Sequence, residues 1–407
     1  MRSRHLLLLL PLALAPVLFG EEPRAARPDK LKAIPAAMQK FVDGNDISGA
    51  VTVVGRADGI VAFDAVGLRE MNEKQPMAKD TLFRIASMTK PVTALGIMIL
   101  ADEGKLSPDD DVAKHLPEFT GQMLLAPRPK DTLADAPVLL QKPKRSVKLR
   151  DLLTHTSGAA PYPKGVNDVY TKRNRTLAET ALATALQPLR FEPGSQWSYS
   201  NEGIDVLGRV IEVVSGEGYE AFLQKRIFDP LEMRDTTFYP TKEQRDRAAT
   251  TYFKARAGQL LPSPNVLLDV PAGAKHPVPA GGLFSTGGDL AKLYRMMLHK
   301  GELGGKRIVS EKAVAEMTKV QTGDIKTGFV DGMGFGFGWA VVREPKGVTA
   351  MLSPGTFGHG GAFGTQGWID PTRDLFVVLL IQRTGLDNAD ASPMREKLQS
   401  LAAEAIK

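Results

Sequence analysis

Residues 83–95 read Phe-Arg-Ile-Ala-Ser-Met-Thr-Lys-Pro-Val-Thr-Ala-Leu. The apolar spacing predicts a helix that begins at Ser87 and runs to about Asp102, with Pro91 tolerated in its first turn. Positions i and i+3 of a helix share one face, so the amine of Lys90 can reach the hydroxyl of Ser87. A serine becomes a nucleophile when a neighbouring base accepts its proton, and a lysine can be that base where burial lowers its pKa.

The Ser-x-x-Lys spacing is weak evidence by itself, because about one copy is expected by chance in a chain this long. A helix-capping serine followed by a surface lysine explains the same spacing equally well. Here the single copy lies at an expected helix start and in an apolar setting. Two further segments strengthen the catalytic interpretation.

The second segment reads Trp-Ser-Tyr-Ser-Asn-Glu-Gly over residues 197–203, in a turn after Pro193-Gly194. The Tyr199 phenol, if held partly as phenolate beside a buried ammonium, can carry a proton. The Asn201 amide can both donate and accept, so it can orient Lys90 and a substrate carbonyl. Simple turn chemistry is the alternative interpretation, since serine, asparagine and glycine favour turns.

The third segment, residues 357–368, is rich in glycine and contains His359, Gly360 and Gly361. Glycine at the start of a strand lets a substrate lie close to the backbone. The N–H group of Ala362 can then complete an oxyanion hole with the N–H group of Ser87. His359 is interpreted as a substrate contact or proton carrier, although a histidine in such a loop is about as often structural.

Strand patterns lie near both ends of the chain and helical patterns lie between them. We therefore expect an α+β fold, an antiparallel sheet flanked by helices with an inserted, mainly helical domain. The sheet region is placed at about residues 29–100 and 281–407, and the helical region at about 101–280. The expected elements are a helix at 29–42, a hairpin at 47–67, strands at 336–342, 367–369 and 375–381, and a helix at 393–406.

The composition excludes several classes of protein. With 407 residues, of which 43% are hydrophobic, the chain can bury a large core. The net charge is +6, but the basic residues are scattered without interleaved aromatics, so no nucleic-acid partner is expected. No cysteine is present, which excludes disulfides, thiolate metal sites and cysteine catalysis. The six histidines are dispersed, so neither a metal nor another cofactor is expected.

Residues 1–20 begin with a basic stretch and continue with an uncharged apolar run from Leu6 to Phe19. This pattern predicts a signal peptide, because the run is too short to span a bilayer comfortably; an uncleaved anchor is the alternative. Residues 21–28 are expected to be a linker, and the hydrolase domain is expected at 29–407. The mature protein is therefore predicted to be periplasmic or secreted, without a membrane span; the sequence assigns no oligomeric state.

The three segments, in this order and spacing, resemble those of the serine β-lactamase and penicillin-recognising superfamily. The nearest branch is similar to class C β-lactamases and family VIII carboxylesterases. The resemblance implies that Ser87 is the nucleophile that forms an acyl-enzyme and that Lys90 accepts its proton. It also implies that Tyr199 is a general base or acid and that Asn201 orients the substrate. The expected partner is a small-molecule or peptide acyl substrate.

One departure bears on the substrate. Class C enzymes carry Lys-Thr-Gly in the third segment, where this chain has His359-Gly360-Gly361. Residues 326–328 do read Lys-Thr-Gly, but we interpret them as a coincidence, because the family's third segment directly precedes a turn like that at 370–371. A lysine supplies a permanent cation for a substrate carboxylate, whereas a histidine is mostly neutral at pH 7. Ester hydrolysis is therefore favoured.

Two alternatives stay open at this point. The chain can be a periplasmic β-lactamase or a D-amino-acid peptidase, which share the acylation step, with the cation supplied by another loop. It can also be a catalytically silent member of the family that serves as a binding or sensor module. Trp339, outside the three segments, is expected to pack in the core.

Overall fold

A computed structural model describes residues 27–127, 137–166, 168–264 and 269–406. The predicted signal peptide and most of the predicted linker lie outside these residues. The helices are α1 (Pro28–Asp43), α2 (Lys90–Asp102), α3 (Val112–His115), α4 (Leu149–Leu153), α5 (Val169–Lys172), α6 (Leu177–Ala185), α7 (Asn201–Ser215), α8 (Tyr219–Leu223), α9 (Lys242–Asp246), α10 (Gly287–Leu298), α11 (Glu311–Thr318) and α12 (Pro393–Ala405).

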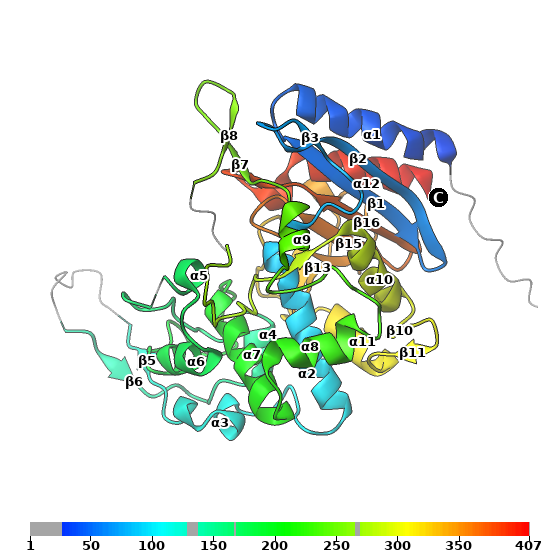
Figure 1. Cartoon of the computed structure of the whole chain (residues 1–407). Helices are drawn as coiled ribbons and strands as arrows, with labels where there is room; N and C mark the ends of the chain where they lie inside the picture. The colour runs from blue at the N-terminus through cyan, green and yellow to red at the C-terminus, as the bar shows by residue number, and fades with distance from the viewer. Residues whose placement is uncertain (1–26, 128–136, 167, 265–268, 407) are drawn as a thin grey trace, which may run out of the picture.

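The main sheet joins the two ends of the chain. Its strand order is β12-β13-β14-β15-β16-β1-β2-β3, with antiparallel neighbours throughout. The strands are β1 (Gly49–Arg56), β2 (Gly59–Glu70), β3 (Gln75–Pro76), β12 (Met333–Phe335), β13 (Ala340–Val342), β14 (Phe357–Gly360), β15 (Gln366–Asp370) and β16 (Leu375–Leu380). Figure 1 shows the early blue strands beside the late orange ones. The expected α+β class with an antiparallel sheet is confirmed.

Short strand pairs lie outside the main sheet. They are β4 (Phe83–Arg84) with β9 (Phe284–Ser285), β5 (Leu124–Leu125) with β6 (Leu140–Gln141), β10 (Glu302–Leu303) with β11 (Lys306–Arg307), and β7 (Tyr252–Lys254) between β8 (Leu260–Pro262) and β17 (Arg383–Thr384). The first pair positions the site, because it fixes β4, just before Ser87, against β9.

Both faces of the sheet are covered, which is why the central strand β16 is apolar without interruption. Side chains alternate across a strand. In β16, Val377 and Leu379 pack with α1 and α12, whereas Phe376 and Val378 join the larger core that also contains residues of α2, α7 and α10. Figure 1 shows α1 and α12 together on one side of the sheet and α10 on the other. The expected helices at 29–42 and 393–406 are thus the cover of one face.

Two local expectations need correction. The expected strand over 336–342 is interrupted, because Gly338 has φ +75° and Gly336 N–H donates to the Trp339 carbonyl at 2.8 Å, which makes a turn between β12 and β13. The expected helix at Ser87 begins instead as a 3₁₀ turn over Ala86–Thr89, and α2 follows from Lys90.

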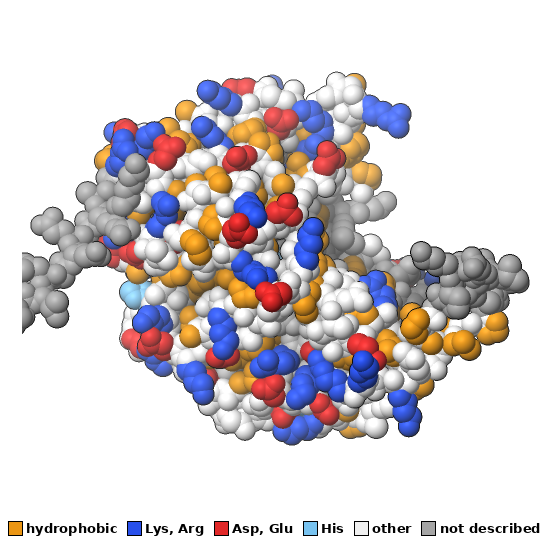
Figure 2. Space-filling view, turned by 180° about the vertical axis from the view of Figure 1, so that it is seen from behind, with side chains coloured by type: hydrophobic (Ala, Val, Ile, Leu, Met, Phe, Trp, Pro, Cys, Tyr) orange, Lys and Arg blue, Asp and Glu red, His pale blue; other side chains and the backbone are white. Residues whose placement is uncertain are grey.

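The surface carries mixed charges. Figure 2 shows lysine and arginine side chains interspersed with acidic ones over the face it presents, without a stripe of one sign. Exposed ion pairs on the surface of the molecule include Lys242 with Asp246 and Lys300 with Glu311. Within the described ranges, no helix is both long and apolar enough to cross a membrane.

Candidate active site

Ser87 lies in a tight turn that the sequence imposes. Pro91 has no N–H group, so it cannot donate to the Ser87 carbonyl as an α-helix requires. The N–H group of Lys90 makes that bond instead, three residues on, which gives the 3₁₀ geometry. The preceding residue, Ala86, has φ +46°, a left-handed conformation that non-glycine residues adopt at a cost. The turn leaves Ser87 partly exposed between buried neighbours.

Lys90 is fully buried, and its amine has three oxygen partners. Nζ lies 3.1 Å from Ser87 Oγ, 2.8 Å from Asn201 Oδ1 and 2.7 Å from the carbonyl oxygen of Ala280. The i, i+3 proximity expected from the sequence is therefore present. The other two partners come from α7 and from the segment before β9, so three separate parts of the chain fix the direction of the amine.

Burial lowers the pKa of Lys90 from 10.5 to about 7, and the negative charges of Asp205 and Glu202 oppose this shift. A buried ammonium loses its hydration, which favours the neutral amine. Near pH 7 a large fraction of Lys90 is therefore unprotonated. A neutral amine 3.1 Å from a serine hydroxyl can accept its proton.

Tyr199 lies against the same amine. Lys90 Nζ is 4.5 Å from the centroid of the Tyr199 ring. The centroids of the His155 and Tyr199 rings are also 4.5 Å apart. His155 Nδ1 also accepts the N–H group of Ser200 at 3.2 Å, so this histidine supports the turn that carries Tyr199.

The expected partial phenolate at Tyr199 is wrong. Burial raises the pKa of Tyr199 well above its usual value, and the hydrogen bond with Ser87 only partly opposes this. The Lys90 amine lies over the face of the ring. Tyr199 is thus a neutral phenol beside Ser87, and it can donate its proton to a leaving group.

Strand β14 brings the glycine-rich segment to the nucleophile. A Cβ atom on Gly361 would lie 2.5 Å from the Ile85 carbonyl oxygen, so only glycine allows this approach to the chain just before Ser87. Ala362 and Ser87 line one cavity of about 70 Å³, whose other lining residues are Ala86, Tyr170, Asn201, Val278, Ala280 and Gly281. None of these lining side chains carries a charge.

His359 lies deeper than an exposed substrate contact would. It is buried, its Nδ1 pairs with the Gly360 carbonyl at 2.6 Å, and it lines a neighbouring cavity with Phe335 and Arg395. Burial, with the charge of Lys90, lowers the pKa of His359 to about 4, so the ring is neutral at pH 7. Lys326 of the coincidental Lys-Thr-Gly has a side chain that is 93% exposed.

Sequence reasoning missed three participants. Asp205 and Tyr170 were not considered, and Ala280 acts through its backbone carbonyl, which no side-chain pattern reveals. One signal was available, because Asp205 interrupts the apolar sequence Ile-Asp-Val-Leu of residues 204–207. A carboxylate in such a position must find buried partners. Trp339 is buried in the core, as expected.

No metal centre is found in the part of the chain that the structure describes, where no three His, Cys, Asp or Glu side chains come together in a way that could hold an ion. The chemistry available here is that of a hydroxyl, an amine, a phenol and an amide. Ser87 and Asn201 line one small cavity, Lys90 contacts both of them, and the Tyr199 ring lies against the Lys90 amine.

Comparisons with known proteins agree with this geometry. The family model described as Beta-lactamase matches residues 34–400. A protein of Mycobacterium tuberculosis is 33% identical over 382 residues, covering 88% of this chain and 91% of that protein. Esterase EstB of Burkholderia gladioli is 30% identical over 357 residues, covering 82% of this chain and 85% of EstB.

A solved structure extends the likeness to three dimensions. EstCE1, a hydrolase with promiscuous acyltransferase activity, has a TM-score of 0.74 and 28% identity, and the match covers 93% of this chain and 98% of EstCE1. The expected resemblance is thus confirmed at the level of sequence and fold. The chain belongs to the beta-lactamase family of serine hydrolases.

Proposed function

We propose that this protein hydrolyses carboxylic esters through an acyl-enzyme on Ser87. The observation that carries the proposal is the buried Lys90 amine, 3.1 Å from Ser87 Oγ and with a pKa near 7. A general base must lie within hydrogen-bond distance of the hydroxyl and have a pKa near the working pH, and this amine meets both requirements. The similarity to EstB and EstCE1 supports ester substrates.

The proposed reaction has two halves. In the first, neutral Lys90 takes the Ser87 proton while Oγ attacks the acyl carbonyl, and the N–H groups of Ser87 and Ala362 stabilise the oxyanion. Tyr199 then donates its proton to the departing alkoxide and regains one from the Lys90 ammonium. In the second half, a water molecule gives a proton to the same pair and attacks the acyl carbonyl. The acyl–Oγ bond then breaks, the pair returns that proton to Ser87 Oγ, and the carboxylic acid is released. Asn201 orients Lys90 throughout.

The absence of charged side chains from the cavity lining favours ester substrates over β-lactams and D-peptides. His359 is neutral, and Arg395 lies in the neighbouring cavity, where its guanidinium stacks on Trp368 at 3.9 Å and donates to Gln399 at 2.9 Å. A substrate carboxylate therefore has no free lysine at the position that class C enzymes use. We accordingly place β-lactamase or D-peptidase activity second.

Mass spectrometry of the intact protein tests the proposal. After brief exposure to a panel of p-nitrophenyl esters, a D-alanyl-D-alanine peptide and penicillins, we expect an acyl adduct on the peptide that contains Ser87 with the esters, and p-nitrophenol release. Adducts and turnover with penicillins or D-peptides alone would favour the second assignment. No adduct with any compound, and no labelling by a fluorophosphonate, would indicate a silent binding module.

The rate is expected to follow the protonation of Lys90. The neutral amine is the active form, and its fraction rises as pH rises through a pKa of about 7. Hence kcat/KM should increase along an acid limb centred near pH 7, with a value at pH 5 about 100-fold below the plateau. Steady-state kinetics from pH 5 to 9 measure this limb. A profile that is flat or falls between pH 6 and 8 would contradict it.

Short acyl chains are expected to be preferred. The cavity beside Ser87 has about 70 Å³, and Val278, with a side chain 1% exposed, forms part of its wall. Overfilling a packed pocket costs about 1–3 kcal/mol, so p-nitrophenyl butyrate should exceed the decanoate in kcat/KM by about tenfold or more. Val278→Ala should raise the decanoate rate relative to the butyrate rate. An unchanged ratio in this variant would contradict the assignment of the cavity.

The place of action is also proposed. The basic and apolar pattern of residues 1–20 supports export, with the mature enzyme periplasmic or secreted. A chain without cysteine needs no disulfide to fold in an oxidising compartment. N-terminal sequencing of the protein recovered from the periplasm and medium would identify the cleavage position.

A further inference from the structure

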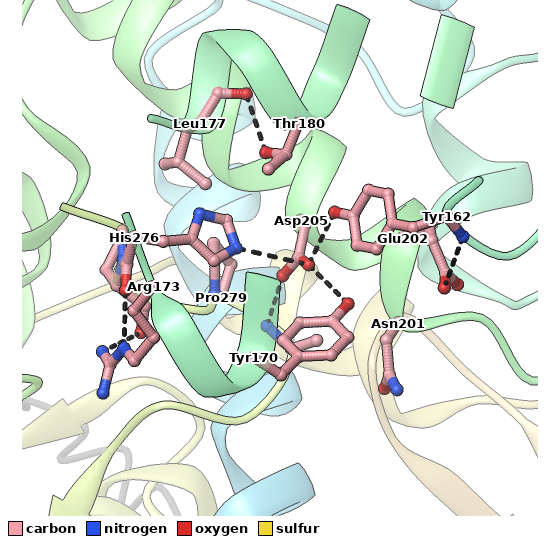
Figure 3. A network of polar contacts seen from close by, with 12 residues as sticks. Tyr162, Tyr170, Arg173, Leu177, Thr180, Asn201, Glu202, Asp205, His276 and Pro279 are labelled. Atoms are coloured by element: carbon pink, nitrogen blue, oxygen red, sulfur yellow. Dashed lines mark hydrogen bonds and ion pairs between the residues drawn. The ribbon is translucent and has the colours of Figure 1, made fainter. Parts of the chain in front are cut away.

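Asp205 is a carboxylate in the core of the molecule that the reaction above does not use. It lies on α7, one helical turn after Asn201, and its side chain is fully buried. Moving a carboxylate out of water is costly unless several donors satisfy it. Figure 3 shows Tyr162, Tyr170 and His276 directed at Asp205 from different segments of the chain.

The carboxylate is satisfied by three hydrogen bonds. Oδ2 accepts the hydroxyl of Tyr162 at 2.9 Å and that of Tyr170 at 2.7 Å, and Oδ1 accepts the N–H group of Ala280 at 3.0 Å. His276 Nε2 lies 3.6 Å from Oδ2, beyond hydrogen-bond distance. Burial and the charge of Asp205 raise the pKa of both tyrosines well above the usual range, so both hydroxyls stay protonated donors.

The backbone of Ala280 connects this carboxylate to the active site. Its N–H group is held by Asp205, and its carbonyl accepts the Lys90 amine at 2.7 Å. Asn201 and Asp205, one turn apart on α7, thus fix the same amine, the first directly and the second through one residue, Ala280. The third partner of the Lys90 amine is Ser87 Oγ.

The segment that carries Ala280 requires such anchoring. Val278 has φ +60°, a conformation that a β-branched residue adopts only when its surroundings impose it. Arg173 donates to the carbonyls of His276 and Pro277 at 2.8 and 3.1 Å, and Thr93 donates to that of Pro279 at 2.8 Å. The hydrogen bond from Ala280 to Asp205 is therefore the link of this strained segment to α7.

We propose that Asp205 is a positioning residue, which fixes the Ala280 carbonyl that receives Lys90 and holds the Tyr170 ring as a wall of the acyl cavity. This inference rests on the proposed function of Ser87 and Lys90. It adds to the groups around the serine a buried cluster that surrounds one carboxylate. We call it the Asp205 cluster, and it consists of Asp205, Tyr162, Tyr170 and His276.

The cluster also sets the charge of Lys90. The Asp205 carboxylate favours the ammonium form, so its removal should move the acid limb to lower pH. The charged or titratable groups that face Asp205 or Lys90 are Tyr162, Tyr170, Tyr199, Glu202, His155, His276 and His359. Glu202 acts on Lys90 in the same direction, but its carboxylate accepts the Ser200 hydroxyl and the Tyr162 N–H group, not the N–H group of Ala280.

The test measures the rate at which a fluorophosphonate labels Ser87, from pH 5 to 9, in the full-length protein. In Asp205→Asn the amide oxygen can still accept the Ala280 N–H group, so the plateau should stay within about threefold of wild type while the midpoint falls by about half a pH unit or more. In Asp205→Ala that bond is lost, and the plateau should fall by about 30-fold or more.

Glu202→Gln is the matched control, because it removes a nearby negative charge without touching the Ala280 peptide. It should move the midpoint downward and leave the plateau unchanged. A wild-type plateau in Asp205→Ala, or a wild-type midpoint in Asp205→Asn, would overturn the inference. Where Asp205→Ala lacks a cooperative unfolding transition, the midpoint of Asp205→Asn decides. Failure of the probe to label wild-type Ser87 would instead contradict the proposed function.

Discussion

Replacing Ser87 with alanine is expected to lower kcat for p-nitrophenyl butyrate by about 10⁴-fold or more. The hydroxyl is the only atom at this position that can form the acyl bond, and the fully buried Lys90 has its other two partners elsewhere. The variant should fold normally, because the Ser87 side chain is partly exposed and its hydroxyl bonds to Lys90 and Tyr199 within the site itself.

Ser195→Ala provides the control for this variant. Ser195 lies in an exposed turn, where its hydroxyl donates to the Glu192 carbonyl at 2.7 Å. Initial rates and the thermal unfolding midpoint should be measured for both variants. Equal turnover by wild type and Ser87→Ala would remove Ser87 from the mechanism, and with it the proposed acyl-enzyme.

Replacing Lys90 with methionine is expected to lower kcat/KM by about 10³-fold or more. Methionine keeps an unbranched apolar side chain at this buried position but has no basic nitrogen. The Ser87 proton then has no acceptor, and Asn201 Oδ1 and the Ala280 carbonyl lose their shared donor. The acid limb near pH 7 should vanish with the amine, and any residual activity should depend on pH differently.

Lys90→Arg separates charge from basicity. A guanidinium keeps a positive charge and several donors, but it does not lose its proton in the accessible pH range. This variant should therefore be as inactive as Lys90→Met at every pH tested. Kinetics from pH 5 to 9 with circular dichroism spectra of both variants check this. Activity of Lys90→Arg within tenfold of wild type would mean that Lys90 serves as a cation and not as a base.

The local part of the site could be predicted from the sequence. Ser87 and Lys90 are three residues apart at the start of a helix, so backbone geometry alone brings this pair together. The order of the three segments then indicated the family and its fold, which the comparisons confirm. The roles of the individual residues stay predictions until the variants are measured.

The remaining features depend on contacts between distant segments. Tyr162, Tyr170 and His276 meet Asp205 only after the chain has folded, and no periodicity marks them in advance. The Ala280 carbonyl is a backbone group, which every residue has. The protonation of Tyr199 depends on its burial, which the sequence does not state.

The sheet order has a consequence for biosynthesis. Strands β14 and β15 reach β1 only through β16, residues 375–380, although every candidate catalytic residue precedes residue 363. The Arg27 N–H group likewise donates to the Ala405 carbonyl at 2.8 Å. A growing chain thus contains its candidate catalytic side chains before the strand that unites the sheet has been made. Such long-range pairing slows folding, and the site is complete only after β16 has joined the two parts of the sheet.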